Sequence, residues 1–383
     1  MLTPLLAKIN EYLPKHDKSC VKNVLILSLC LLIKETVNLN KLKGTVGAVL
    51  GKSDTQPDSN YKRLIRIFDR HSESTLWLDL LVFVFTFLSL RGDYLVLDGT
   101  SWRSGKTKFH FLTLCVVYQN VAIPIFWRNL HKIGHSSTQE RIGLIKSALC
   151  RFDLAYSVLV ADREYVGTKW FKYLIENETV RRAIDFIIRL KRGTYKEAID
   201  QSEGRSYEQL CDKVRRSKVA SKVLNKPFVL EGMPLNFVAL KNGKRDQDDP
   251  LIDLLTSLRE PARSVAEKYR MRWKIEAFFK HMKTNGFSLE AMNLGTESRC
   301  QLLMAVVVFA YVLSIREGLK TYRKVRVKQY ADGSVEREES VFRYGLNRLM
   351  RFCADLNTFS RHLFSELGSN KMQIPILIFE NVQ

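Results

Sequence analysis

Two short apolar runs in this chain each end in an aspartate, and they constrain the fold more than any other feature. The runs are Tyr94–Asp98 (YLVLD) and Ser157–Asp162 (SVLVAD), and a third apolar run spans Ala183–Leu190. After the first run come two branched and aromatic stretches separated by a short polar turn, which is typical of a hairpin. Helical stretches at 137–151 and 168–177 separate the runs. The resulting order predicts a mixed α/β sheet with helices on its faces.

The two aspartates are candidate site residues because of where their strands end. Ligands of open α/β sheets bind at the rim formed by strand ends, so we expect Asp98 and Asp162 on one rim. An aspartate after a strand is also a common turn former. Neither residue alone therefore indicates a site.

A third carboxylate comes from residues 262–284, which predict one helix. Tyr269, Arg272, Glu276 and Lys283 share a stripe about 60° wide on that helix, at about 100° per residue. Core-facing stripes are normally apolar, so this one is expected to face a polar or charged partner. A single glutamate on a helix is otherwise most often solvated.

Three carboxylates on separate elements suggest metal-dependent phosphodiester chemistry. Asp98, Asp162 and Glu276 could hold two divalent ions that activate an attacking oxygen and stabilise a leaving one. Hard oxygen ligands favour Mg²⁺, and no cluster of histidines and cysteines offers a zinc site. Cations beside Glu276 would bind phosphate and keep the carboxylate ionised.

The charge balance points to a polyanionic partner. The chain has 383 residues with a formal net charge of +21, which favours nucleic acid. Its seven scattered cysteines predict buried free thiols in a reducing cytosol, not disulfides. We expect no signal peptide and no membrane span, and we expect the longest apolar stretches, Leu78–Leu90 and Leu302–Leu313, to be buried core helices.

Residues 1–91 predict a helical domain that binds DNA. Within it, a helix at Asn38–Leu50, a turn and a basic helix at Asn60–Arg70 suggest a helix-turn-helix-like reader. Its candidate DNA contacts are Lys62, Arg63 and Arg66. The alternative is that this basic face is simply solvated.

Four blocks of the sequence resemble the DDE transposases of bacterial insertion sequences, specifically the insertion-sequence-four family. The similarity extends over about residues 20–315. The blocks are LVLDGTSW (Leu95–Trp102), the stretch from Gly134 to Glu140, VLVADREYVGTKWF (Val158–Phe171), and Tyr269, Arg272, Glu276 and Lys283 in a Y-x2-R-x3-E-x6-K signature. The signature is the specific part of the resemblance.

This resemblance implies a domain organisation. The catalytic core would be RNase H-like, formed by residues 92–190 and 261–318, with a β-rich insertion at 191–260. Residues 319–383 would form a C-terminal helical region that binds DNA or dimerises.

The resemblance also assigns roles to individual residues. Asp98, Asp162 and Glu276 would bind two Mg²⁺ ions, with Mn²⁺ able to replace them. Three stripe residues would contact the transposon-end backbone: Tyr269, Arg272 and Lys283. Arg163 is a further candidate for a phosphate contact, with a structural salt bridge as the alternative.

The implied reaction is cut-and-paste DNA transposition. Water cuts the first strand, and the freed 3′ hydroxyl attacks the opposite strand to give a hairpin that is reopened before joining. The partners would be double-stranded DNA, as terminal inverted repeats and target, and a second copy in a synaptic dimer. The expected location is the bacterial cytoplasm, at the nucleoid when bound to DNA.

One aromatic residue of the family has no counterpart in this sequence. In a relative, a tryptophan in the insertion stacks on a flipped base, but no tryptophan lies between Trp170 and Trp273 here. Base stacking tolerates other rings. Four aromatic residues could stack instead, or could simply pack the insertion: Tyr195, Tyr207, Phe228 and Phe237.

Two other functions remain open at this point. A catalytically inactive or domesticated DNA-binding regulator of the same fold would use the basic charge equally well. A nuclease that cuts without joining would have the same residues. The joint presence of three carboxylates and the polar stripe favours an enzyme over the regulator.

Overall fold

A computed structural model describes most of the chain, namely residues 2–90, 92, 94–104, 107–152, 158–176, 183–219, 222–242, 250–330 and 335–368. The chain forms two compact units. The first contains residues 1–90, 102–109 and 278–376, and the second contains residues 91–101, 110–277 and 377–383. The four-part functional division stays a prediction, and its last part lies outside the described residues from 369 onward.

The first unit is largely helical. Its helices are α1 (Leu2–Asn10), α2 (Lys18–Lys34), α3 (Leu39–Val49), α4 (Pro57–His71), α5 (Leu76–Leu88), α12 (Glu297–Thr321), α13 (Val341–Leu349) and α14 (Leu356–Gly368). Shorter pieces are η2 (Leu289–Ala291), η3 (Tyr322–Lys324), η4 (Met350–Phe352) and a ribbon of β9 (Val327–Gln329) with β10 (Val335–Arg337). The helices expected in the N-terminal 90 residues are therefore present, within about three residues of the expected bounds.

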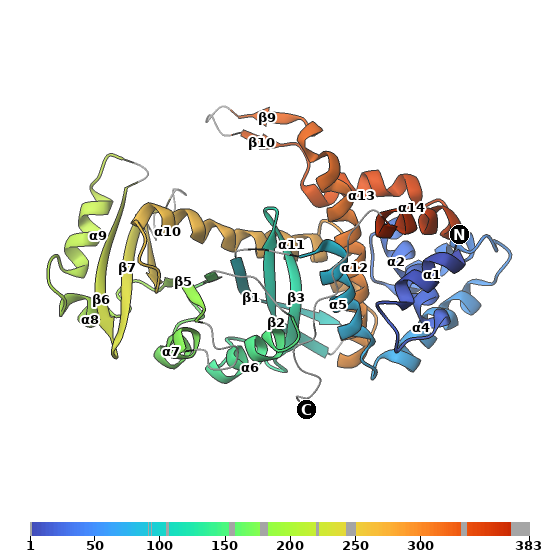
Figure 1. Ribbon diagram of the computed structural model, residues 1–383, viewed down its shortest axis with the longest axis horizontal. Coiled ribbons are helices and arrows are strands. Elements are labelled where there is room, and N and C mark those ends of the chain that lie inside the picture. Colours follow the sequence, from blue (N-terminus) through green and yellow to red (C-terminus); the bar gives the residue numbers. More distant parts are fainter. Residues whose placement is uncertain are drawn as a thin grey trace. The chain divides into compact units, whose positions relative to one another are not determined.

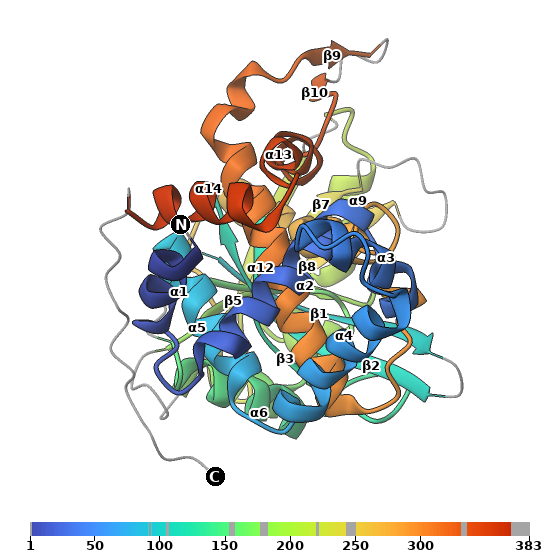
Figure 2. The same cartoon turned by 90° about the vertical axis from the view of Figure 1, so that its right-hand side faces the viewer.

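Helix α12 forms the core of this unit. It packs against α2, α5 and α13, and Figure 2 shows it in orange among them. It is long and apolar enough to cross a membrane, yet 89% of its apolar window is buried. The expectation of a buried core helix here agrees with this burial, because an all-round apolar helix needs neighbours on every side.

The second unit is built on a mixed sheet of eight strands in the order β3-β2-β1-β4-β5-β8-β7-β6. The strands are β1 (Tyr94–Ser104), β2 (Thr107–Tyr118), β3 (Val121–Asn129), β4 (Val158–Ala161), β5 (Asp185–Leu190), β6 (Val223–Leu230), β7 (Met233–Lys241) and β8 (Leu251–Thr256). Strand β1 pairs in parallel with β4, and β4 pairs in parallel with β5. The mixed sheet predicted from the apolar runs is thus present.

Strand β1 is longer than predicted. It continues past Asp98, where the predicted run ends, to Ser104. Its parallel pairing with β4 nevertheless ends at Leu97, opposite Ala161. Asp98 is therefore the first residue beyond the paired segment, although it does not end its strand.

Segment 191–260 does not form a sheet of its own. Its strands continue the main sheet, because β8 pairs antiparallel with β5 and β7 pairs with β8. Two helices that the sequence reading did not predict, α8 (Lys196–Asp200) and α9 (Tyr207–Arg215), belong to the same segment. The three apolar strands extend the existing sheet because β5 offers a free edge to β8, and β7 and β6 follow β8 in the sheet.

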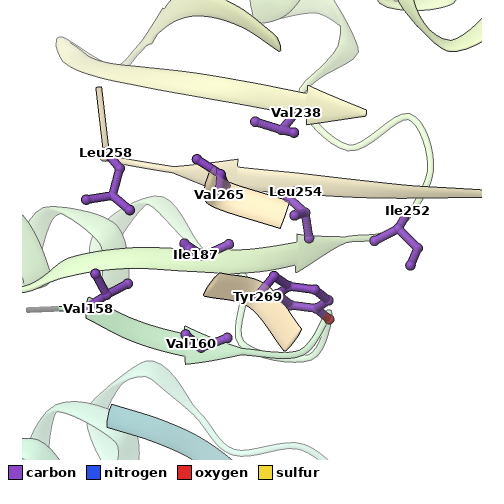
Figure 3. Packing of buried hydrophobic residues seen from close by; sticks show 9 residues of the cluster. All are labelled: Val158, Val160, Ile187, Val238, Ile252, Leu254, Leu258, Val265 and Tyr269. Carbon is purple, nitrogen blue, oxygen red and sulfur yellow. The ribbon is translucent and has the colours of Figure 1, made fainter. Parts of the chain in front are cut away.

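Helices cover both faces of the sheet. Helices α6 (Thr138–Leu149) and α7 (Thr168–Glu176) lie on one face, and α10 (Ala262–Tyr269) lies on the other (Figure 1). The predicted single helix at 262–284 is interrupted, because a 3₁₀ turn, η1 (Arg270–Arg272), separates α10 from α11 (Trp273–Lys283). Valine, isoleucine and leucine side chains of four strands pack against Val265 and Tyr269 of α10 (Figure 3).

Candidate active site

The sheet register brings the two predicted aspartates to neighbouring positions. Leu97 pairs with Ala161, so Asp98 and Asp162 are the next residues on adjacent parallel strands. Each carboxylate accepts a hydrogen bond from the amide of the following residue, Gly99 or Arg163, at 2.8 Å in both cases. Their equivalent positions bring both residues to the same edge of the sheet, Asp98 within β1 and Asp162 directly after β4.

Asp98 carries negative charge that its surroundings do not compensate. Burial raises the pKa of its carboxyl to about 7. The Gly99 amide and the Arg272 guanidinium oppose this rise in pKa, whereas the carboxylates of Glu164 and Asp162 add to it. A cation placed here would favour the ionised form and reverse the shift.

Arg272 connects the third carboxylate to this rim. Its Nη1 lies 2.6 Å from Oε1 of Glu276 and 3.6 Å from Oδ2 of Asp162. The residue is 7% exposed, and its guanidinium lies 5.9 Å and 5.7 Å from the ring centroids of Tyr269 and Trp273. The guanidinium therefore occupies the position of a counter-ion between two of the three predicted metal ligands.

Tyr269 is a core residue more than a surface one. It is 2% exposed and packs with Val160 and Ile187, as Figure 3 shows. Burial raises the pKa of its phenol, and its hydroxyl has no hydrogen-bond partner among the described residues. The ring cannot serve as a DNA-facing surface, so a contact with the transposon end would fall to the hydroxyl.

The polar stripe is therefore less uniform than the helical wheel predicts. The 3₁₀ turn at Arg270–Arg272 tightens the backbone between Tyr269 and Glu276 and shifts their relative directions. Lys283 belongs to the first unit, where its ammonium lies 3.4 Å from the Glu290 carboxylate. Its predicted DNA contact stays a prediction.

The remaining predicted DNA contacts lie on the surface. Arg163 is exposed, and no ion pair of its side chain occurs among the described residues, which leaves it available for phosphate. In the first unit, Lys62 and Arg66 of α4 are exposed and Arg63 is partly exposed. The buried face of α4 includes Leu64 and Phe68, as the amphipathic pattern indicated.

The three carboxylates are not assembled around a common point in this arrangement. In the described part of the chain, no three histidine, cysteine, aspartate or glutamate side chains could hold one metal ion together. The reason is Arg272, whose guanidinium pairs with Glu276 and so occupies the position that a metal ion would take. The donor types and the uncompensated charge at Asp98 fit Mg²⁺, and Glu276 would complete the set by exchanging Arg272 for the ion.

The structure also brings a fourth carboxylate, Glu164, close enough to raise the pKa of Asp98. Sequence reasoning noted the Asp-Arg-Glu run but gave Glu164 no role. The signal was its position two residues after a strand-end aspartate, which places it on the same rim. His135, whose Nδ1 lies 3.2 Å from Oε2 of Glu164, belongs to the Gly134–Glu140 block and received no individual role.

The aromatic residues of the insertion are packing residues. Tyr207, Phe228 and Phe237 are buried, with Tyr207 donating a hydrogen bond to Asp253 at 2.5 Å. Tyr195 is partly buried, and its ring lies edge-on to Phe171 with centroids 6.2 Å apart. The packing alternative therefore describes these rings better than base stacking does.

The seven cysteines are free and six of them are buried, which agrees with the prediction of buried free thiols in place of disulfides.

The model of the transposase DDE domain family matches residues 92–313, more than half of the chain. A comparison with curated proteins finds no match. Among solved structures, a cryo-EM synaptic complex of the piggyBac transposase with hairpin DNA is similar over 96% of this chain and 77% of that chain, with 12% identity and a TM-score of 0.49. Similarity of that degree supports no conclusion by itself.

Proposed function

This chain belongs to the transposases that carry a DDE domain, and we propose that it cuts DNA at transposon ends and joins those ends to target DNA with divalent metal ions. The observation that carries the proposal is the register that sets Asp98 beside Asp162, with Glu276 joined to Asp162 through Arg272. An inert scaffold would gain nothing from a partly buried carboxylate whose negative charge is only partly compensated.

The metal-binding residues of the proposal are Asp98, Asp162 and Glu276. Bound Mg²⁺ would activate the attacking oxygen and stabilise the leaving oxygen. Asp98 and Asp162 are fixed by the backbone amides that follow them, so their oxygens are already oriented. Glu276 is the adjustable ligand, since its present partner is a side chain.

Arg272 has two uses in this proposal. Without DNA, it neutralises Asp162 and Glu276. With DNA, its planar guanidinium suits a bidentate contact with phosphate. A phosphate beside the carboxylates would draw Arg272 away from Glu276 and release that ligand, which couples DNA binding to assembly of the site.

Finer assignments belong to the same proposal. We infer an insertion-sequence-four type of enzyme from the signature of Tyr269, Arg272, Glu276 and Lys283. An enzyme of that type would have an RNase H-like core, form a hairpin intermediate and act as a synaptic homodimer in the bacterial cytoplasm. The strand order β3-β2-β1-β4-β5, with β1, β4 and β5 parallel, supports the core assignment.

Strand cleavage of the element's own terminal inverted repeats tests the proposal. Wild-type protein with Mg²⁺ should nick the 3′ end of the transposon strand and then transfer it to a target plasmid. The inactive regulator predicts retained DNA binding without any metal-dependent product. The simple nuclease predicts nicks without transfer products, so one gel separates the three functions.

A further inference from the structure

A histidine–glutamate pair lies on the same rim as the aspartates but outside the three-carboxylate set. Nδ1 of His135 lies 3.2 Å from Oε2 of Glu164. His135 comes from the loop between β3 and α6, and Glu164 comes from the loop between β4 and α7. Neither residue is used by the function proposed above.

The two loops are fastened together by one buried arginine. Arg141 is 4% exposed and donates from Nη2 to the carbonyl oxygens of Ser136 at 2.6 Å and Glu164 at 2.9 Å. Its Nε donates to the Ser136 hydroxyl at 2.9 Å, and its guanidinium lies 5.3 Å from the Tyr165 ring centroid. The residue next to His135 and the backbone of Glu164 are thus fixed relative to each other.

A helix cap at Ser137 and an ion pair of Lys132 hold the same loop. The Ser137 hydroxyl accepts a hydrogen bond from the Glu140 amide at 3.3 Å, and the Glu140 carboxylate accepts one from the Ser137 amide at 2.6 Å. Lys132 pairs with Glu140 at 2.7 Å. The loop that carries His135 is therefore anchored on both sides of the histidine.

The loop that carries Glu164 lies against the strand that carries Asp98. The Glu164 carboxylate also adds to the raised pKa of Asp98. On the strand itself, a methyl group at Gly99 would lie 2.8 Å from Nε2 of His110 and 3.6 Å from the Tyr165 hydroxyl, so this loop packs closely against the residue after Asp98. The His135 side chain is 73% exposed, and with Nδ1 on Glu164 its Nε2 faces away from that carboxylate.

A proton donor is what the three-carboxylate set lacks. Carboxylates that hold cations are ionised and have no proton to give. Phosphodiester cleavage that frees a 3′ hydroxyl breaks the bond between phosphorus and the 3′ oxygen, and that oxygen must gain a proton. A histidine oriented by a carboxylate is a common general acid.

We propose that His135 is the general acid of strand cleavage and that Glu164 is its positioning residue. This inference rests on the transposase function proposed above. The attacking water oxygen bonds to phosphorus and loses its proton to solvent. The phosphorus–3′ oxygen bond breaks, and the departing 3′ oxygen takes the proton from Nε2 of His135. Glu164 accepts the hydrogen bond from Nδ1–H and stabilises the charged imidazolium before transfer.

A sulfur-substituted substrate tests this role directly. A thiolate leaving group needs no protonation, so a substrate with sulfur in place of the 3′ bridging oxygen bypasses a general acid. Full-length protein is compared on both substrates with Mn²⁺ throughout, because Mn²⁺ accepts sulfur better than Mg²⁺ does. On the oxygen substrate, His135→Ala should nick about 100-fold more slowly. On the sulfur substrate, it should nick within about threefold of wild type.

Two further variants make the result decisive. Glu164→Gln should lose about tenfold on the oxygen substrate and recover on the sulfur one. Lys132→Ala, which removes a charge from the same loop and leaves the His135–Glu164 pair in place, should give equal ratios on both substrates. Equal losses for His135→Ala on both substrates, or no loss on either, would overturn the general-acid role. Wild-type protein that never nicks with metal would instead overturn the transposase function itself.

Discussion

Two carboxylates in this protein, Glu317 in the first unit and Asp98 in the second, have opposite electrostatic surroundings. Glu317 on α12 is 3% exposed and lies 2.7 Å from Lys320, 3.4 Å from Arg348 and 3.4 Å from His362. A hydrogen bond from His362 is the largest of the effects that lower its pKa to about 2, against burial, which raises it. Asp98 has its pKa raised to about 7 by burial, and two further carboxylates add to that rise.

The difference separates a structural carboxylate from one that awaits a cation. Glu317 is surrounded by enough cationic groups to outweigh the cost of burial, so its charge stabilises the fold. Asp98 has a single nearby guanidinium, on Arg272, which also serves Asp162 and Glu276. Proteins keep such an imbalance where function requires it.

The largest expected effect comes from Asp98→Asn. It should reduce Mg²⁺-dependent nicking by about 1,000-fold or more, because several kcal/mol of transition-state charge stabilisation depend on the ion it holds. Metal-free protein should unfold at a higher denaturant concentration than wild type, since a buried uncompensated charge is removed. Cleavage rates and urea unfolding curves measure the two changes. If Asp98→Asn were less stable than wild type and nicked DNA at the same rate, Asp98 would be a structural carboxylate and the contrast with Glu317 would be wrong.

Glu317→Gln should act in the opposite way. It leaves Lys320, Arg348 and His362 without their shared anion, and should lower the free energy of unfolding by about 2 kcal/mol, less than a fully buried pair because the cations are partly exposed. Nicking at permissive temperature should stay within about threefold of wild type. Urea denaturation gives the first value and cleavage the second. An unchanged midpoint would show that Glu317 contributes no net stability.

Acid should remove the same contribution from the wild type. The pKa of Glu317 is lowered from 4.5 to about 2 in the folded protein, so its stabilisation is present above pH 4.5 and is lost as the pH falls toward 2. Stability of the wild type should therefore fall by about 1–2 kcal/mol more than that of Glu317→Gln over this window. Parallel unfolding curves for the two proteins at each pH test the assignment, and identical pH slopes would refute it.

The smallest expected effect comes from substituting Arg272, whose guanidinium neutralises carboxylates of the proposed metal site. Arg272→Gln should bind Mn²⁺ about tenfold more tightly in the absence of DNA, or about 1.4 kcal/mol, because a competing cation is gone. Electron paramagnetic resonance titration of free Mn²⁺ measures this. Arg263→Gln is the matched control, since Arg263 pairs with Glu267 at 3.2 Å on the exposed side of α10. Weaker Mn²⁺ binding by Arg272→Gln would show that it orders the carboxylates instead of competing for them.

The sequence predicted those features that depend on local pattern. Apolar runs located β1, β4 and β5, and their order placed Asp98 and Asp162 on one rim, which the register realises. The amphipathic and apolar helices of the first unit followed from their periodicity.

Features set by three-dimensional packing could not be predicted in this way. A helical wheel treats Tyr269 as part of a polar stripe, but a phenol is also a good core residue, and the sheet beneath α10 buries it. The 3₁₀ turn before Trp273 has no proline or glycine to signal it. The pairing of His135 with Glu164 joins two loops 29 residues apart, and no periodic pattern reports such a contact.

The sheet extension at β8, β7 and β6 has an evolutionary consequence. These strands lie beyond β5 at one edge of the sheet, whereas β1 lies between β2 and β4, and β4 lies between β1 and β5. The register of the aspartates does not depend on that edge, but Val238 and Leu254 of these strands pack against α10, the helix that leads to Arg272 and Glu276. Sequence divergence among descendants should therefore accumulate first in the parts of segment 191–260 that do not contact α10, while the strands that carry Asp98 and Asp162 change slowly.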